Sequence, residues 1–367
     1  MNITPHLFIT DTNLLEGNAI EQLKSTSSLS GIISSVGFPD LHAGKGSPVG
    51  AAYLTSNIIY PYIIGNDIGC GMALFKTDLE CHKFKADKIE RKLDDLESPY
   101  EESRELFKQL NIGENLFPDS LGTLGGGNHF AEFLKIDEIY NEEEFFKLNI
   151  SKKEVFLLVH SGSRGLGQSI LEEHIRHHNS EGLDPNSSSG INYLNRHNYA
   201  LSWAKFNREM IAQRISEKIG ISFERLLDLV HNSIEELSEK KFLHRKGAAR
   251  IDKLGIIPGS RGDFTYLVAP QKNSLETLFS LPHGSGRKWI RGHVKDRLSH
   301  KFKAEDLKKT ALGSTVICAD KELLYDEAPE AYKKVTFIID ELEKNNLAKP
   351  ILKFRPLLTY KKRNTRW

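Results

Sequence analysis

Aspartate, cysteine and histidine recur in glycine-rich segments between residues 37 and 287, and these side chains could carry chemistry. Residues 66–71 (NDIGCG) place the carboxylate of Asp67 and the thiol of Cys70 three positions apart. The glycines allow the chain to bend there, so both groups can face one cavity. A glycine-rich turn with a capping aspartate and a buried cysteine is the alternative for this segment taken alone.

Residues 125–132 (GGGNHFAE) combine a glycine run with His129. Consecutive glycines let a ligand approach the backbone closely and leave N–H groups free to bind an anion. The histidine would then lie where the chain re-enters regular structure. A simple turn is the alternative for this run.

Residues 160–167 (HSGSRGLG) follow a short apolar run, VFLLV, at positions 155–159. We predict a buried strand for this run and a helix from about Leu166. His160 and Arg164 would then lie at a helix N-terminus, where free N–H groups and the helix dipole favour phosphate. A strand, a histidine, a Gly-Ser-Arg loop and a helix in this order favour a functional site over a plain turn.

Residues 281–289 (LPHGSGRKW) place His283 directly before a Gly-Ser-Gly-Arg sequence. The glycines keep the space beside the imidazole open, and Arg287 can hold a phosphate next to it. A neutral imidazole nitrogen in such a site can attack phosphorus. A histidine in an ordinary turn is the alternative.

Further segments carry weaker signals. His231 lies within RLLDLVHNSIEEL (225–237), which we predict to be helical, and a single histidine on such a helix is more often a core residue than a ligand. Residues 244–249 (HRKGAA) are predicted to form a basic loop, and residues 258–262 (PGSRG) add a further glycine-containing segment.

Considered together, these segments indicate a transition-metal site beside a phosphate site. Thiolate and imidazole favour zinc on ligand type alone, whereas a carboxylate favours harder ions such as manganese. Arg164, Arg287 and Arg291 would add phosphate-binding groups, and metal next to phosphate suggests phosphoryl or nucleotidyl transfer. The chain has neither a GxxxxGK[ST] loop nor a strand–GxGxxG–helix unit, so any nucleotide must be bound in another way.

Strands and helices must bring these distant segments together. Apolar runs bounded by glycine and proline predict strands in the first third of the chain, at GIISSVGFPD, GAAYLTSNIIYPYIIGND and GMALFKTDL. Residues 83–110 are typical of one or two amphipathic helices, residues 137–148 of an acidic solvated connector, and residues 180–191 of a flexible loop.

The clearest helix in the sequence follows that loop. Its apolar face carries Tyr199, Trp203, Phe206 and Met210, and Gly220 should end it. We expect an α+β fold with mixed β-sheets, in which residues 1–367 form one composite domain.

The composition is that of a soluble globular protein. Fifty Lys and Arg residues balance 49 Asp and Glu residues, hydrophobic residues make up 39% and charged residues 27%. This excludes a globally basic protein but leaves room for a local basic patch. Cys70, Cys81 and Cys318 are few and widely spaced, which favours a reducing compartment. Because no leader and no run of about 20 apolar residues is present, we predict a cytoplasmic protein without a membrane span.

The segments as a set resemble the RtcB family of GTP-dependent RNA-splicing ligases. The similarity rests on FPDLHAGKGSPVG, GNDIGCGM, GTLGGGNHFAE, LLVHSGSRGLG, HNYA, VHN, HRKGA, IPGS and HGSGR, which run from residue 38 to 287. Weaker matches at EAPEAYKKV and PLLTYK extend it to nearly the whole chain. The fold implied is an RtcB-like domain with sheets and helices packed around a central metal and GTP cleft.

The resemblance implies a ligase that joins RNA ends bearing a 3′-phosphate or 2′,3′-cyclic phosphate to 5′-hydroxyl ends, in RNA repair or tRNA splicing. It also implies GTP and two Mn(II) ions as cofactors, with His283 taking GMP from GTP as a phosphoramidate. The metal ligands implied are Asp67, Cys70, His129, His160 and His231. Asp40, Arg164, Arg287 and Arg291 would support RNA phosphates and catalysis alongside His283.

The residues implied to contact the guanine nucleotide are spread along the chain. They are Asn128, His129, Phe130, Ala131, Glu132, His231, Asn232, Pro258, Gly259, Ser260, Arg261, Thr265, His283, Gly284, Ser285, Gly286, Tyr332 and Lys361. A basic groove for RNA would draw on Lys246, Arg287, Lys288, Arg291 and the basic C-terminus.

The sequence departs from the family pattern at several positions. Arg261 stands where the family usually has methionine, HGSG replaces HGAG, Lys45 replaces a tyrosine, and Lys361 is followed by a second lysine rather than glycine. These departures leave open which RNA is joined and whether an activating protein is needed. We expect a monomer.

Two other functions remain open at this point. A metal-dependent cyclic phosphodiesterase acting on RNA ends would share Asp67, Cys70 and the histidines but would not need an activated His283. A non-catalytic RNA-binding repair accessory would need none of these groups, so the retained ligand set argues against it.

Overall fold

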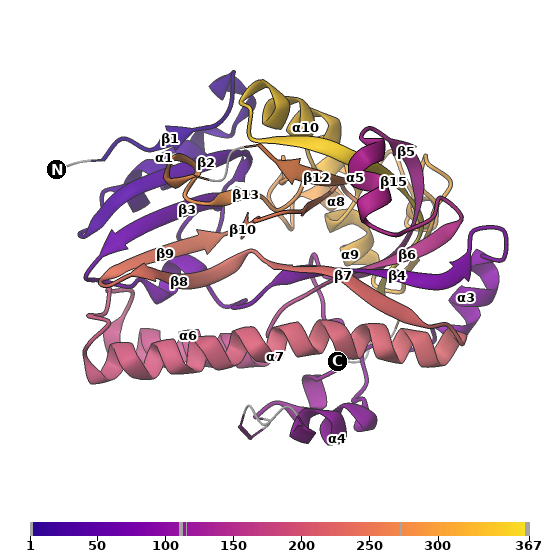
Figure 1. Cartoon of the computed structure of the whole chain (residues 1–367), viewed down its shortest axis with the longest axis horizontal. Coiled ribbons are helices and arrows are strands. Elements are labelled where there is room, and N and C mark those ends of the chain that lie inside the picture. The colour runs from indigo at the N-terminus through magenta and orange to yellow at the C-terminus, as the bar shows by residue number, and fades with distance from the viewer. Residues whose placement is uncertain (1–2, 110–112, 115, 272–273, 364–367) are drawn as a thin grey trace.

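Two large β-sheets dominate the computed structural model, which describes residues 3–109, 113–114, 116–271 and 274–363 (Figure 1). One sheet has five strands in the order β1-β2-β3-β9-β8. The other has eight strands, in the order β11-β12-β15-β5-β6-β4-β7, with β14 paired to β15. The strands of the five-stranded sheet are β1 (His6–Leu7), β2 (Ile32–His42), β3 (Val49–Ser56), β9 (Lys241–Lys246) and β8 (Asn232–Ser238).

The eight-stranded sheet pairs residues from both halves of the chain. Its strands are β4 (Gly71–Glu80), β5 (Phe130–Ile139), β6 (Glu154–Ser161), β7 (Phe223–Val230), β11 (Gly255–Pro258), β12 (Thr265–Pro270), β14 (Thr315–Cys318) and β15 (Ala348–Lys362). A further two-stranded sheet pairs β10 (Ala248–Arg250) with β13 (Ser280–Pro282). The strands predicted in the first third of the chain and at VFLLV are confirmed as β2, β3, β4 and β6. The second half of the run GAAYLTSNIIYPYIIGND is an exception, because Pro61–Ile64 form a short helix instead of a strand. Mixed sheets with helices around them confirm the predicted α+β class.

Helices cover the outer faces of the sheets (Figure 1). They are α1 (Gly17–Ser27), α2 (Pro61–Ile64), α3 (Ala86–Lys92), α4 (Glu101–Gln109), α5 (Glu142–Lys147), α6 (Gly165–His178), α7 (Ser188–Ile219), α8 (Val294–Leu298), α9 (Lys321–Asp326) and α10 (Val335–Lys344). The pair α3 and α4 confirms the helices expected within residues 83–110, of which residue 110 lies outside the described residues. No described helix has the length and apolar character needed to cross a membrane.

Helix α7 is the longest helix of the described chain and lies along both large sheets (Figure 1). The side chain of Ser187 accepts a hydrogen bond from the backbone N–H of Gly190 at its start, and Gly220, with φ of 75°, ends it as predicted. The loop predicted over residues 180–191 is therefore too long, because the capping serine begins the helix at residue 188. Leu183 in this loop is buried and forms a β-bridge with Ile59.

The helix predicted at residues 225–237 is wrong. This segment forms β7 and β8, with His231 as the single residue between them. β7 pairs with β4 in one large sheet, and β8 pairs with β9 in the other. The closely spaced leucines suggested a helical face, but strand pairing on both sides decides the conformation.

Two other connectors are also more regular than predicted. Residues 137–139 belong to β5 and residues 142–147 to α5, so the expected acidic connector is largely structured, and Phe145 is buried beneath it. The basic loop expected at residues 244–249 lies mostly in β9 and β10, where His244, Arg245 and Lys246 are buried.

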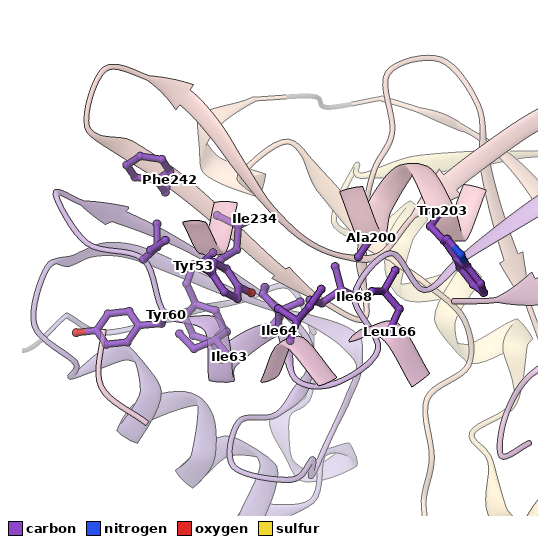
Figure 2. Close-up of a cluster of buried hydrophobic side chains, with 14 of the residues drawn as sticks. Tyr53, Tyr60, Ile63, Ile64, Ile68, Leu166, Ala200, Trp203, Ile234 and Phe242 are labelled. Atoms are coloured by element: carbon purple, nitrogen blue, oxygen red, sulfur yellow. The ribbon is translucent and has the colours of Figure 1, made fainter. Parts of the chain in front are cut away.

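A hydrophobic core fills the space between the five-stranded sheet and helices α2, α6 and α7 (Figure 2). This core supports one wall of the candidate active site described below. Tyr53 of β3, Ile234 of β8, Leu166 of α6 and Trp203 of α7 belong to this cluster. Ile68 joins it and is fully buried. Burial of an isoleucine side chain contributes about 1.5–3 kcal/mol, so Ile68 anchors the loop that carries its neighbours Asp67 and Cys70.

Candidate active site

A cleft of about 1170 Å³ is lined by side chains from both large sheets. Its predicted residues come from strands, strand ends and the loops between them. They are Asp67, Cys70, Asn128, His129, Phe130, Glu132, His160, Arg164, His231, Asn232, Pro258, Gly259, Ser260, Arg261, His283, Gly284, Ser285, Gly286, Arg287, Tyr332 and Lys361.

Neighbouring strands of the eight-stranded sheet bring four of the predicted metal ligands together at one end of these strands. The strand order is β5-β6-β4-β7. The register pairs near this end of the strands include Phe130↔His160, Met72↔His160 and Gly71↔Val230. His160 is itself one of these paired residues, and His129, Cys70 and His231 are each next in sequence to one. Antiparallel pairing therefore gathers side chains that lie up to 161 positions apart, since 231 − 70 = 161.

All five predicted metal ligands meet at this end of the strands. The Sγ of Cys70 lies 3.5 Å from Nε2 of His129 and 3.2 Å from Nε2 of His160. Nε2 of His160 lies 3.4 Å from Nε2 of His231. Oδ2 of Asp67 lies 2.9 Å from Nε2 of His129. The donor atoms of Cys70, His129 and His160 all lie within 4.8 Å of one another, which is close enough to share one ion.

The electrostatics of this cluster favour a bound cation. Burial raises the pKa of the Cys70 thiol, and the carboxylate of Asp67 raises it further. Burial and the neighbouring imidazoles lower the pKa of His160 and His231, so both are neutral. A divalent ion reverses the first effect by stabilising the thiolate, and it uses the free lone pairs of neutral imidazoles. The donor set therefore fits a divalent transition metal.

Helix α7 fixes the metal-ligand loops through a residue that the sequence analysis missed. Nη1 of Arg208 donates to the carbonyl oxygens of Gly69, at 2.8 Å, and Ser161, at 2.9 Å. Its Nη2 lies 2.5 Å from Oδ1 of Asp228, and both side chains are buried. The only signal in the sequence was a charged residue amid the buried apolar residues of the helix.

His283 lies directly beside the metal-ligand cluster. Its ring centroid is 4.8 Å from that of His231. Its Nδ1 lies 2.7 Å from Oδ2 of Asp40, whose side chain is fully buried and lies behind the histidine rather than on the cleft surface. Because Nδ1–H donates to this carboxylate, the lone pair is left on Nε2. His283, which the sequence predicts to be the nucleophile, is therefore held in the tautomer that a nucleophile needs.

His42 is a second imidazole at this point, and the sequence analysis did not select it. Its Nδ1 lies 2.9 Å from the carbonyl oxygen of Asp40, and its ring centroid is 6.4 Å from that of His283. Burial lowers the pKa of His42 to about 3, so it is neutral. The feature of the sequence that could have pointed to His42 is its position two residues after Asp40 in a glycine-rich segment.

Two of the residues predicted to contact the nucleotide do not line the cleft. Phe130 and Glu132 of β5 face it, so Ala131 faces the opposite side of the strand and is fully buried. Thr265 is buried in β12, where it pairs with Pro258 and Phe354. Neither residue lines the cleft in this structure, so a contact of Ala131 or Thr265 with the nucleotide remains a prediction.

Glu132 and Lys361 are both buried in the cleft wall. Oγ1 of Thr359 donates to Oε1 of Glu132 at 2.6 Å. Burial raises the pKa of Glu132 to about 8, although Thr359 and Lys361 work against that shift. Burial also lowers the pKa of Lys361. Such shifts are typical of groups kept for a ligand rather than for solvent.

A family model for "tRNA-splicing ligase RtcB" matches residues 22–114 and 109–362. The chain belongs to the RtcB family. It is 44% identical to the "RNA-splicing ligase RtcB2" of Escherichia coli over 355 residues, which cover 95% of this chain and 93% of that protein. It is 27% identical to the "tRNA-splicing ligase RtcB" of Nanoarchaeum equitans, over 98% of this chain and 96% of that one, and 27% identical to that of Archaeoglobus fulgidus, over 94% and 91%. This chain is therefore a ligase enzyme of the RtcB type.

Arg164 shows why this RtcB chain needs its glycine run. Arg164 precedes α6 with φ of 56°, and its Nε lies 3.4 Å from Oγ1 of Thr123. Gly125 has φ of +89°, and a Cβ there would lie 1.8 Å from Nη1 of Arg164. A side chain at Gly125 would therefore displace the guanidinium from the cleft. Arg291 approaches the other end of the run, 3.4 Å from a Cβ at Gly127.

Arg261, the departure from the usual RtcB pattern, is 7% exposed and lines the cleft. Its Nη2 donates to the carbonyl oxygen of Leu324 at 2.7 Å. Its Nε and Nη1 are buried without a hydrogen-bond partner among the described residues. Burial lowers the pKa of Arg261, and the nearby carboxylate of Glu327 partly restores it.

The basic groove expected for RNA is only partly free in this RtcB chain. Nζ of Lys246 donates to the backbone and side-chain oxygens of Ser47 at 3.1 and 3.0 Å. Arg287 is also bonded within the protein, to the carboxylate of Glu327 at 3.1 Å. The side chain of Arg291 is 45% exposed and Lys288 is exposed, so these two remain accessible. Glu327, which the sequence analysis did not select, thus occupies the centre of the cationic wall.

Proposed function

We propose that this RtcB protein joins RNA 3′-phosphate or 2′,3′-cyclic phosphate ends to 5′-hydroxyl ends through a GMP adduct on His283, using GTP and Mn(II). The observation that carries the proposal is the placement of His283. Its Nδ1 is held 2.7 Å from Asp40, and its ring lies 4.8 Å from the ring of a metal-cluster histidine, His231. An imidazole with a free Nε2 beside a cation site suits attack on a bound triphosphate.

Asp67, Cys70, His129, His160 and His231 would hold two divalent ions, whose charge would offset that of the triphosphate. Nε2 of His283 attacks the α-phosphorus of GTP, the P–N bond forms, and pyrophosphate leaves. Asp40 stabilises the positive charge that develops on the imidazole through the Nδ1–H bond. Manganese is favoured over zinc by the family resemblance, since the ligand types alone do not select it.

The remaining steps act on the RNA ends. A cyclic end is first hydrolysed to the 3′-phosphate. An oxygen of that 3′-phosphate then attacks the phosphorus of the GMP adduct, and the P–N bond breaks to regenerate His283. The RNA 5′-hydroxyl finally attacks the activated 3′-phosphate, loses its proton and displaces GMP. Arg164 and Arg291 flank the glycine run from opposite ends, where their guanidinium groups can hold the RNA phosphates.

The nucleotide would be bound by cleft residues beside the metal cluster. Glu132, Ser260, Tyr332 and Lys361 line the cleft and offer donors and acceptors suited to a purine edge. Arg261 adds two unpartnered donors to the same cleft. We also expect the protein to act as a monomer.

The proposal is tested by incubating the protein with α-labelled GTP and Mn(II). Label should remain on the wild-type chain in an acid-labile form and should be absent from His283→Ala. His82→Ala is a matched control, because the His82 side chain is 68% exposed. Absence of label on the wild type at every Mn(II) concentration would exclude the ligase mechanism.

An end-group assay separates the ligase from its alternatives. Opening of a cyclic phosphate without GTP, and without joined product, would indicate a phosphodiesterase built on the same metal cluster. Purified protein that holds no metal but binds a nicked stem-loop would indicate an RNA-binding accessory.

A further inference from the structure

Glu327 lies directly after helix α9, and its side chain is only 5% exposed. Its Oε1 accepts from Nη1 of Arg287 at 3.1 Å and from Nη2 of Arg291 at 3.2 Å. Its Oε2 accepts from the hydroxyl of Tyr332 at 2.7 Å and from Nζ of Lys361 at 3.3 Å. One buried carboxylate therefore bonds four side chains of the cleft wall, two through each oxygen.

Further contacts close this network into a ring. Nη1 of Arg287 also donates to the Tyr332 hydroxyl at 3.0 Å, and its guanidinium lies 4.9 Å from the centroid of the Tyr332 ring. Nη2 of Arg287 donates to the carbonyl oxygen of Asp326 at 2.8 Å. Since Tyr332 accepts from Arg287 and donates to Glu327, each of the three side chains limits the position of the other two.

The charge balance of the wall shows that Glu327 does not merely neutralise it. Burial works to raise the pKa of Glu327, but Lys361, Arg291 and Arg287 outweigh burial, so that pKa is lowered and the carboxylate stays ionised. One negative charge faces three cations. The wall keeps a net positive charge for an anionic ligand, while the carboxylate fixes where each cation lies.

The four partners differ in exposure in a way that suits this arrangement. The side chains of Arg287 and Lys361 are 11% and 3% exposed, whereas that of Arg291 is 45% exposed. Arg291 can therefore turn towards an incoming phosphate while the buried partners remain in place. Its guanidinium already reaches the glycine run at Gly127.

We propose that Glu327 is a positioning residue of the active site. One oxygen sets Tyr332 and Lys361 for the guanine nucleotide, and the other sets Arg287 and Arg291 for RNA phosphate. The inference rests on the proposed function, which assigns Tyr332 and Lys361 to the nucleotide and Arg291 to RNA phosphate, and it adds Arg287 to the RNA side.

The test compares full-length Glu327→Gln with wild type in Mn(II). Glutamine has a single acceptor oxygen, so only one of the two pairs can keep its partner. We expect kcat/KM for labelling by α-labelled GTP to fall at least tenfold. We also expect the slope of log Kd against log salt, for single-stranded RNA with a 3′-phosphate, to steepen by about 0.7, because one more cation is left uncompensated.

Glu322→Gln is the matched control, because it removes the same charge from α9 at a side chain that is 65% exposed. A double-mutant cycle with Tyr332→Phe adds a second readout: if Glu327 acts through Tyr332, the double variant should lose clearly less than the sum of the two single losses. Additive losses, or a Glu327→Gln variant that matches Glu322→Gln in labelling and salt slope, would overturn the inference.

Glu327→Asp keeps the test decisive if the glutamine variant does not fold. Aspartate preserves the charge but is one methylene shorter, so labelling should fall while the salt slope stays at its wild-type value. Wild-type labelling by Glu327→Asp would overturn the inference. Failure of the wild type itself to be labelled would instead remove the proposed function, and the salt slope would still report on the role of Glu327.

Discussion

Burial sets the protonation states of individual side chains on which the proposed chemistry depends. His42, His160 and His231 are neutral because their imidazoles are desolvated. Asp40 directs the proton of His283 to Nδ1 and so leaves the reactive lone pair on Nε2. Short segments of sequence revealed His283 and its neighbours because glycines flank them.

Glu132 provides a pH-dependent prediction at this scale. The pKa of Glu132 is raised to about 8 by burial, whereas in the unfolded chain the group should titrate near the ordinary glutamate pKa of 4.5. Between these values the unfolded state has lost the proton and the folded state has kept it, so stability falls as pH rises from about 4.5 to 8. We expect Glu132→Gln to stabilise the protein by a few kcal/mol more at pH 8 than at pH 4.5, as measured by denaturant unfolding. The same change at Glu138, half-exposed on the same strand, should show no such trend.

Glu327, His42 and Arg208 mark the limit of prediction from single residues. Glu327 and Arg208 bond groups that are distant in sequence, as when Glu327 accepts from Lys361 across 34 positions, and the ring of His42 lies beside that of His283. No spacing rule connects such partners, because sheet register and buried hydrogen bonds bring them together. Glycine-flanked histidines are visible in a sequence, and the family resemblance added Asp40, whereas the supporting roles of Glu327 and Arg208 were not predicted.

At the scale of elements, strand order does most of the work of assembling the site. The sequence predicted β4 and β6 but not their adjacency, and it predicted a helix where β7 and β8 run. Leucines in adjacent positions favour a helix locally, yet pairing with β4 and β9 overrides that preference. Helix α7 was predicted well because its cap and apolar face are local signals.

Arg208 of α7 tests how far one helix supports the ligand loops. Arg208→Met leaves Asp228 buried without its partner and frees two loop carbonyls, so we expect a loss of about 3–5 kcal/mol in unfolding free energy. Metal content of the purified protein should fall as well. Arg225→Met breaks a more exposed pair with Glu209 and should cost at most about 1 kcal/mol. Equal losses in the two variants would show that Arg208 has no special role.

For the whole molecule, the candidate metal ligands link the two large sheets, so a bound ion would couple binding to folding. These ligands come from strands and loops that span both large sheets, since His231 joins β7 to β8. The sequence predicted one composite domain, and the cleft residues come from both sheets.

Metal removal should therefore lower the melting temperature. An ion present at a hundred times its Kd stabilises the folded state by about 2.7 kcal/mol, so chelation should shift the melt down and Mn(II) should restore it. Cys70→Ala should abolish this response. Cys81→Ala should retain it, because Cys81 is remote from the cluster and packs against a different part of the core. A wild-type melting temperature that does not change on addition of chelator or Mn(II) would contradict the prediction.

The junction at His231 also limits how the length of this chain can change. A strand in one sheet is followed after a single residue by a strand in the other. An extra amino acid here would turn every following side chain of β8 to the opposite face or pull the imidazole from its place. Surface turns in the same chain carry no such restriction, so insertions and deletions accumulated over evolution should be found there and not beside this histidine.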